Sequence, residues 1–371
     1  MDINSFVIGY KKGKASGGGG GGSLEGFHMV RFFNDDQTTL LYTVFVPTGA
    51  DVIYAGETPI STEDSTFVFK GFEPSAENIT ADFDCYATYV AVSTLDETSW
   101  KTISELSEVG LAEDYFAVGD TKMIHIEGTV GTVELNGDYG VYIIGFDHNK
   151  STEGTGIHFG TFKTAVSGGK DIALCDENYN KSALDGSKWF SYNHWGNAIY
   201  SRWKGCDLRY DILGSTDVAP SNYGSSDTNT TVGYDPSETC TTNPVPNTLM
   251  AALPADLRAI MKPMIKYTCI SNSADAQKTI DYLPLLSEME VRGSISYSYK
   301  FGGELQKRYA YYTSGKSTIK YKHSDTATKM KWVLRAFSSN NAHPVSVYIS
   351  EGQFDNGQAH TSYGLAPIFK V

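Results

Sequence analysis

The cysteines of this sequence include no closely spaced pair. There are five, and neighbouring ones lie at least 29 positions apart, namely Cys85, Cys175, Cys206, Cys240 and Cys269. A C-x-x-C motif for redox chemistry or zinc binding is therefore absent. An odd, scattered set is typical of reduced, buried thiols in a protein that folds in a bacterial cytoplasm.

Long apolar runs and an export signal are also missing. No stretch approaches the roughly 18 apolar residues that a membrane-spanning helix needs. The short apolar run near the N-terminus is Phe6 to Tyr10, and the nearby lysines follow it instead of preceding it, unlike those of a secretory signal. We therefore expect no membrane insertion and synthesis in a bacterial cytoplasm.

Basic residues are fewer than acidic residues. The chain has 30 Lys and Arg against 43 Asp and Glu, which gives a formal net charge of -13. Such a chain repels the phosphate backbone of a nucleic acid and the surface of an anionic bilayer. Nucleic acid is therefore excluded as the expected partner.

Motifs of the common catalytic classes are absent as well. The sequence contains no H-E-x-x-H, no G-x-S-x-G, no Walker loop and no dinucleotide-binding fingerprint. A glycosidase needs two carboxylates about 5 to 10 Å apart, and a pair among the 43 acidic residues stays open. We expect a protein that is not an enzyme and that has no cofactor.

One short stretch carries residues that suit a metal. His148 and His158 flank Glu153, but ten positions separate the two histidines. Asp147, Asn149 and Glu153 supply oxygen atoms that could hold Ca²⁺ in a loop. The alternative is that these side chains cap the backbone of a turn, and we expect no metal site here.

Glycine and aromatic residues are abundant. The 371 residues, enough for two or three domains, include 37 Gly, 24 Tyr and 18 Phe, a profile typical of β-rich proteins. Gly17 to Gly22 form an uninterrupted run that predicts a flexible tether. Residues 1–14 before it, with Phe6, Ile8 and Tyr10, predict a peg that docks on another protein, or else a disordered terminus.

Residues 27–91 predict a small β domain. Alternation and turn residues place four strands, at Phe27 to Phe33, Leu40 to Val46, Phe67 to Phe69 and Phe83 to Tyr89. The segments Phe69-Lys70-Gly71-Phe72-Glu73-Pro74 and Thr80-Ala81-Asp82 resemble the Phe-x-Gly-Trp-x-Pro and Thr-x-Asp signatures of the internalin B-repeat. Phe72 stands where that module has Trp. The resemblance implies a β-grasp-like spacer or adhesive module.

The next stretch, residues 92–118, predicts a connecting helix. Trp100, Ile103, Leu106 and Val109 form an apolar stripe at helical spacing, which residues 96–99 can cap. Strands are then expected at Met123 to Glu127 and Val141 to Phe146. Further along, Leu249 to Leu253 and Ala255 to Met261 predict two helices, with Pro254 at a first helical position. The run from Ser215 to Pro246 predicts a long surface loop.

The C-terminal forty-odd residues predict a terminal sheet. Val345, Val347 and Ile349 alternate with polar residues, which indicates a half-buried strand. Asp355-Asn356-Gly357 predicts a turn. Trp332-Val333-Leu334-Arg335, this strand and the closing Gly364-x-x-Pro367-x-Phe369 resemble the ending of C-type-lectin-like domains in tail and surface proteins of Firmicutes and their phages.

Other segments extend this resemblance over residues 119–371. They are GDTKMIHIEGTVG, IIGFDHN, IHFGTFKTA and KDIALCD in the first half, and LMAALPADLRAIMKPMIKYT, DYLPLLSEMEVRG and QKRYAYYTSG in the middle. The aromatic-rich segment from Trp189 to Gly214 corresponds to the part that lines the groove of such domains. The resemblance places Trp332 and Leu334 in the core.

Polar residues and Tyr in loops near the C-terminus are the expected ligand contacts, because binding usually resides in loops on a rigid scaffold. Hydroxyls and apolar faces of a glycan suit such side chains. The alternative is that these residues only solvate an exposed end. The candidate ligand-binding residues are Asn340, Asn341, His343, Tyr348, Asp355, Asn356, His360 and Tyr363.

Together these features predict an α+β, β-rich, multidomain chain. Its expected parts are an anchor peptide and glycine tether (1–26), a B-repeat-like domain (27–91), a connecting helix (92–118) and a C-type-lectin-like domain (119–371). The resemblance implies a bacteriophage or prophage virion protein on the tail or head exterior, probing a host-surface glycan or protein as a homotrimer. Residues 1–14 would bind other virion proteins. A head fibre or decoration protein, and a bacterial adhesin, are the alternatives.

Overall fold

The computed structural model describes residues 26–64, 67–174, 203, 208–216, 240–268, 277–296, 306–337, 344–347, 354–356 and 363–371. The chain forms two compact units, and the boundary between them in the sequence lies between Ser93 and Thr94. Both are rich in strands and the second also carries helices, so the chain is a β-rich α+β protein with more than one domain.

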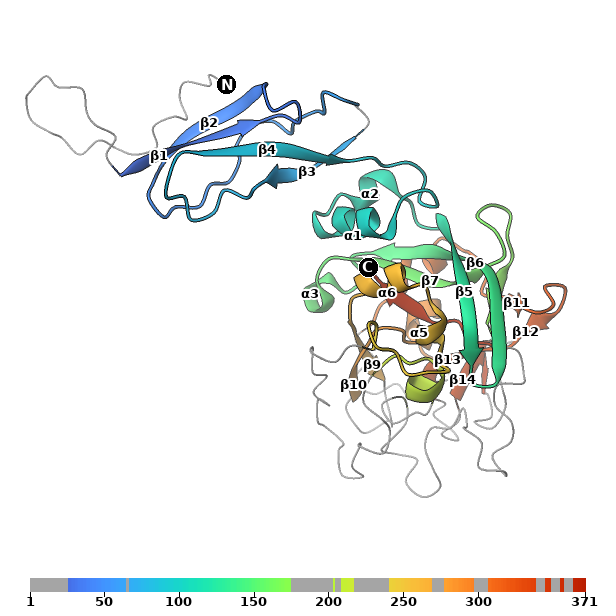
Figure 1. Ribbon diagram of the computed structural model, residues 1–371. Helices are drawn as coiled ribbons and strands as arrows, with labels where there is room; N and C mark the ends of the chain where they lie inside the picture. The colour runs from blue at the N-terminus through green and yellow to red at the C-terminus, as the bar shows by residue number, and fades with distance from the viewer. Residues whose placement is uncertain are drawn as a thin grey trace, which may run out of the picture. The chain divides into compact units, whose positions relative to one another are not determined.

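The first unit is built on one four-stranded sheet with the order β2-β1-β4-β3 (Figure 1). Its strands are β1 (Phe27–Phe33), β2 (Leu40–Pro47), β3 (Val68–Glu73) and β4 (Phe83–Val90). β1 lies parallel to β4 and antiparallel to β2, while β3 is antiparallel to β4. The four strands expected from the sequence are thus confirmed.

Aromatic rings fill the core of this unit. Phe32 is 2% exposed and its ring meets that of Phe72 edge to face at 4.8 Å. The ring of Tyr54 lies 4.7 Å from that of Phe72. Cys85 is a buried free thiol, and burial raises its pKa to about 11. Phe72 is partly buried and packs against this core.

The second unit begins with α1 (Trp100–Glu108), which starts after Ser99, whose side chain accepts a hydrogen bond from the Thr102 N–H. The buried face is the stripe predicted from the sequence, although Val109 is 49% exposed. The Trp100 ring lies 5.3 Å from that of Phe159 and 6.0 Å from that of Phe369. The expected connector is thus an integral part of the second unit. α2 (Ala112–Tyr115) follows.

A seven-stranded sheet forms the centre of the second unit, with the order β12-β11-β8-β7-β6-β5 and with β16 also paired to β7 (Figure 1). The strands are β5 (Thr121–Val130), β6 (Val133–Phe146), β7 (Ile157–Lys163), β8 (Asp171–Ala173), β11 (Lys320–Lys322), β12 (Lys329–Met330) and β16 (Ile368–Lys370). Because β16 is the closing strand, the C-terminus of the chain is built into this sheet.

Smaller elements surround the central sheet. The strands are β9 (Met264–Thr268), β10 (Gln277–Asp281), β13 (Trp332–Phe337), β14 (Pro344–Val347) and β15 (Phe354–Asn356). The helices are α3 (Lys150–Glu153), the π-helical turn η2 (Leu208–Ile212), α5 (Leu249–Ala252), α6 (Ala255–Ile260), α7 (Glu288–Arg292) and α8 (Ala310–Thr313). No helix in these described ranges is long and apolar enough to cross a membrane.

Several local expectations are confirmed and others are corrected. Trp332 and Leu334 are fully buried, as predicted. Both helices around Pro254 form, but Pro254 itself occupies the N-cap position. Asp355 and Asn356 were expected in a turn, yet both lie in β15, because pairing with β14 outweighs their preference for turns. Ser215, expected in a surface loop, is fully buried.

Candidate functional site

The predicted ligand-binding residues fall mostly outside the described part of the chain. Asn340, Asn341, His343, Tyr348 and His360 lie outside it. Asp355 and Asn356 belong to β15, opposite Ser346 and Val345 of β14. Tyr363 is 7% exposed and offers a ligand little surface.

Strand pairing shows where residues 338–343 and 357–362, which hold several of the predicted contacts, leave the described strands. Phe337, the last residue of β13, lies opposite Pro344, the first of β14, and Asn356, the last of β15, lies opposite Val345. Residues 338–343 and 357–362 therefore attach at the same end of the three-stranded sheet. Val347, which precedes Tyr348, lies opposite Trp332 at the other end. The topology thus places at one end the starts of the segments that hold Asn340, Asn341, His343 and His360, with Asn356 beside them. Gly364, which follows Tyr363, pairs with Trp332 at the other end, where Tyr348 also follows its strand.

β13 is firmly held in the interior. The Trp332 indole Nε1–H donates to the Thr318 carbonyl at 2.9 Å. Arg335 is fully buried, and its Nη1 donates to the Leu285 carbonyl at 2.8 Å and to the Glu290 carboxylate. The strand that leads into residues 338–343 is therefore anchored by a buried charge.

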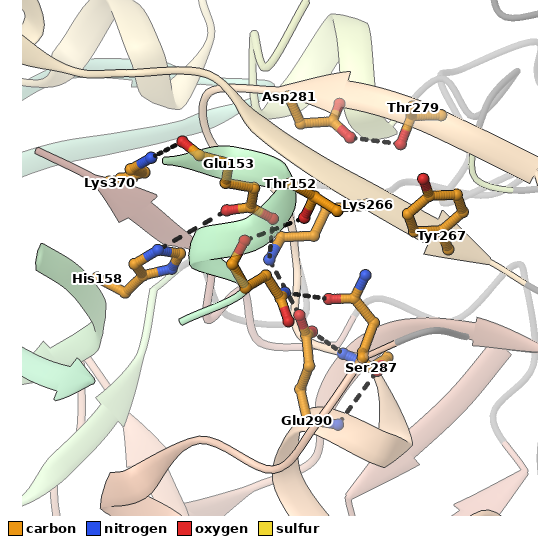
Figure 2. Close-up of polar contacts among 12 residues, drawn as sticks. Thr152, Glu153, His158, Lys266, Tyr267, Thr279, Asp281, Ser287, Glu290 and Lys370 are labelled. Atoms are coloured by element: carbon orange, nitrogen blue, oxygen red, sulfur yellow. Dashed lines mark hydrogen bonds and ion pairs between the residues drawn. The ribbon is translucent and has the colours of Figure 1, made fainter. Parts of the chain in front are cut away.

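Arg335 belongs to a group of polar side chains that we call the buried cluster. Its members are Glu153, His158, Lys266, Glu290, Tyr309 and Arg335, whose side chains are fully buried. Figure 2 shows Glu153 reaching from α3 toward His158 on one side and Lys266 on the other. Five segments distant in sequence thus meet at one point.

The cluster contains a closed ring of four groups. Lys266 Nζ lies 3.8 Å from Glu153 Oε1, and Glu153 Oε2 lies 3.7 Å from His158 Nε2. His158 Nδ1 is 2.9 Å from the Tyr309 hydroxyl, to which Lys266 Nζ donates at 3.2 Å. Since that hydroxyl accepts from Lys266, it can donate its hydrogen to His158 Nδ1. His158 Nε2 then carries a hydrogen that faces Glu153.

Local structure positions both carboxylates. Ser287 and Glu290 form a capping box at the start of α7, in which the Ser287 N–H donates to Glu290 Oε2 at 2.9 Å. On the other side, Asn149 adopts a left-handed conformation with φ of 59° ahead of α3, and Lys370 Nζ donates to the Glu153 carbonyl. The S-x-x-E spacing of the capping box is a signal for part of this cluster that the sequence itself carries.

Charge and burial compete at Glu290 and Glu153. Burial alone would raise the pKa of Glu290, but Arg335 and Lys266 together outweigh it and lower the pKa to about 2. At Glu153, burial raises the pKa and Lys266 only partly opposes it. Glu290 is therefore the firmly ionised member, tied to Lys266 Nζ at 3.0 Å.

Two buried histidines lie beside these charges. Burial lowers the pKa of His148 to about 3, and the ring of His148 stacks on that of Tyr309 at 3.6 Å. Burial, reinforced by Lys266, lowers the pKa of His158 well below its ordinary value. Both imidazoles are therefore neutral near pH 7 in the folded protein.

These histidines predict a loss of stability in mild acid. Because their folded pKa values lie below the unfolded value of 6.5, their contribution is complete above pH 6.5 and is lost as the pH falls. Below pH 6.5 the unfolded chain takes up a proton at each histidine. Each histidine should then lower the unfolding free energy by about 1.4 kcal/mol per pH unit. The raised pKa of Glu153 acts in the opposite direction.

Urea unfolding between pH 7.5 and 5.5 measures this slope. His148→Phe keeps a ring for stacking on Tyr309 and removes one titrating group, so its slope should be smaller. An unfolding free energy that does not change over this range would contradict the assignment.

The Ca²⁺ loop considered from the sequence has a different explanation. Asp147 Oδ2 accepts from Lys150 Nζ at 2.6 Å, and Oδ1 accepts from the Gly156 N–H at 2.9 Å. Its oxygens thus hold the turn together. Among the described residues, no group of three or more His, Cys, Asp or Glu side chains is arranged to hold a metal ion.

A second buried charge lies on β10. Asp281 is fully buried and accepts from Trp203 Nε1 at 3.1 Å, from Arg209 Nε and from the Thr279 hydroxyl at 2.7 Å. Figure 2 shows Thr279 and Asp281 on this strand beside the cluster. Trp203 and Arg209, from the described part of the aromatic-rich segment, therefore lie in the interior, and most of that segment lies outside the described residues.

Comparison with known proteins finds one family. A family description, "Domain of unknown function (DUF6273)", matches residues 178–371. No curated protein and no solved structure matches the chain. The matched region contains β13 to β15, Lys266, Glu290 and Arg335, whereas Glu153 and His158 precede it.

Proposed function

The chain belongs to the family described as "Domain of unknown function (DUF6273)", which matches more than half of it, and we propose that it is a non-enzymatic bacteriophage structural protein. In this proposal it is a tail-fibre or baseplate-associated adsorption protein. Its C-terminal, C-type-lectin-like domain recognises a glycan or protein on the host surface. Residues 1–14 attach it to other virion proteins.

The single observation that carries this proposal is the anchoring of β13 to β15. The segments 338–343 and 357–362 attach at one end of this sheet, and Arg335 and Trp332 fix its first strand to the interior. Recognition loops on a rigid scaffold have this organisation. The sequence of these segments supplies Asn and His, which hydrogen-bond sugar hydroxyls.

The buried cluster supports a role other than catalysis. It contains the acids, histidine and lysine that enzymes use, but these side chains are fully buried. A catalytic group must lie within hydrogen-bond reach of its substrate. In this proposal the cluster holds the scaffold that presents the loops.

We expect Asn341→Ala, Tyr348→Ala and Asn356→Ala together to abolish adsorption of virions to host cells. These changes remove hydrogen-bonding and stacking groups from the predicted loops and, at Asn356, from the end of β15. The melting temperature should change by only a few degrees, since surface changes usually cost within about 0.5 kcal/mol. Unchanged adsorption of the triple variant would refute the site, and adsorption lost only together with folding would also count against it.

Antibody imaging of purified virions tests the location. An antibody to residues 119–371 should label the tail tip or baseplate. Label on the capsid would favour the alternative of a head fibre or decoration protein. Label on bacterial cells that release no virions would favour the adhesin alternative.

We also expect the full-length chain to form a homo-oligomer, in this proposal a trimer. Several tethered copies gain avidity for a repetitive surface, and virion fibres are usually symmetric. Light scattering of the purified chain at micromolar concentration measures the mass. A stable monomer, both free and in extracts of assembled virions, would contradict the expectation.

A further inference from the structure

A pocket of about 460 Å³ lies beside the buried cluster, between the end of β6 and α8. Its lining residues include His148, Lys307, Arg308, Thr313 and Ser314. None of the described lining residues is a carboxylate, although the chain as a whole carries a net charge of -13. The pocket is therefore a locally cationic site on an acidic protein.

The two cations of the pocket are available for a ligand. Lys307 and Arg308 are exposed, and no carboxylate within the described ranges pairs with either of them. Arg308 uses its Nε to donate to the Val291 carbonyl at 3.0 Å, which fixes the orientation of the guanidinium. A guanidinium and an ammonium contributed to one pocket suit the two charges of a phosphate group.

The hydroxyl hydrogens of Thr313 and Ser314 are already used in hydrogen bonds to the backbone. Thr313 Oγ1 donates its hydrogen to the Tyr309 carbonyl at 3.1 Å, and Ser314 Oγ donates to the Tyr311 carbonyl at 2.6 Å. Each oxygen therefore offers only lone pairs to the pocket. Lone pairs accept hydrogen bonds from the hydroxyls of a sugar or polyol.

One lining residue of the pocket, His148, is held in place by the buried cluster. His148 is 3% exposed and stacks on Tyr309, which is fully buried in the cluster. The Nε2 atom of His148 has no hydrogen-bond partner among the described residues. Since Tyr309 lies between Arg308 and Ala310 in the sequence, the cluster fixes the backbone that carries the cations.

From this arrangement we infer that the pocket binds a phosphorylated sugar or polyol. Its phosphate lies against Lys307 and Arg308, and its hydroxyls donate to Thr313 and Ser314. A pocket of this volume accommodates a monosaccharide phosphate. None of the described lining residues belongs to residues 338–363, so the site can be tested independently of host adsorption.

Isothermal titration of the full chain with glucose 6-phosphate, glucose and inorganic phosphate tests the inference. Glucose 6-phosphate should bind at least about tenfold more tightly than either partial probe, because only it meets both the cations and the acceptors. Inorganic phosphate binding as tightly would overturn the role of the hydroxyls. Glucuronate binding more tightly would overturn the choice of phosphate, and no binding would overturn the site.

Variants locate the binding. Lys307→Gln should weaken glucose 6-phosphate about tenfold, since it removes a charge-assisted hydrogen bond. Lys101→Gln makes the same charge change at a lysine that is 82% exposed on α1, and it should have no effect. Thr313→Val should weaken glucose 6-phosphate but not inorganic phosphate. Equal weakening by the two lysine variants would indicate non-specific attraction and overturn the site.

Discussion

Glu290→Gln is expected to destabilise the second unit by about 3 to 5 kcal/mol, because it removes one partner of a buried ion group. The substitution keeps the shape of the side chain and the capping position. It leaves Lys266 and Arg335 as buried cations, with the Glu153 carboxylate at 3.8 Å from Lys266 as the remaining acidic partner there. A surface carboxylate would not have this effect, because water replaces the lost partner.

Tryptophan fluorescence during urea unfolding measures this change specifically. The five tryptophans, Trp100, Trp189, Trp195, Trp203 and Trp332, all follow Ser93, so the signal reports on the second unit. The matched control is Glu113→Gln, an exposed acid on α2, which should change stability by no more than about 0.5 kcal/mol. Similar unfolding of the two variants would show that the cluster does not hold the scaffold.

Trp332→Ala is expected to cost about 3 to 5 kcal/mol by opening a cavity in the core. The ring is fully buried among residues that include Tyr309, Met330 and Ile368. The Ala variant also removes the Nε1 hydrogen bond to Thr318 and the ring that lies 5.1 Å from the Lys320 ammonium. Lys320 is 1% exposed, and burial lowers its pKa to about 8, so this contact with the ring matters.

Trp332→Phe separates packing from hydrogen bonding. It retains an aromatic ring and removes the indole N–H, so it should cost only about 1 to 2 kcal/mol. Circular dichroism during urea unfolding follows both variants without relying on the altered fluorescence. Equal costs for Ala and Phe would mean that the hydrogen bond, and not the volume of the ring, is the main contribution.

Short-range patterns predicted much of the secondary structure. The four strands of the first unit and α1 were expected from alternation, helical spacing and a capping Ser99, and all five form. These signals are local, since a side chain's face depends only on its neighbours along the element. The burial of Trp332 and Leu334 came instead from a family resemblance.

Long-range pairing decided what the sequence could not. α1 was expected to be a connector, but Trp100 packs on Phe159 and Phe369, which no local pattern links to it. Asp355 and Asn356 have the preferences of turn residues, yet their pairing with β14 makes them strand residues. In the second case strand pairing outweighed a local preference worth about 1 kcal/mol.

The sequence by itself determined that this is an acidic, β-rich chain with strands and helices at particular places, because composition and periodicity are properties of the chain alone. Only the tertiary structure decided which charges are buried. Glu153, His158, Lys266, Glu290 and Arg335 come from four separate segments of the sequence, and they form one cluster because strand pairing and helix packing bring those segments together. Burial then makes each of these charges depend on its partners, since no water can replace them.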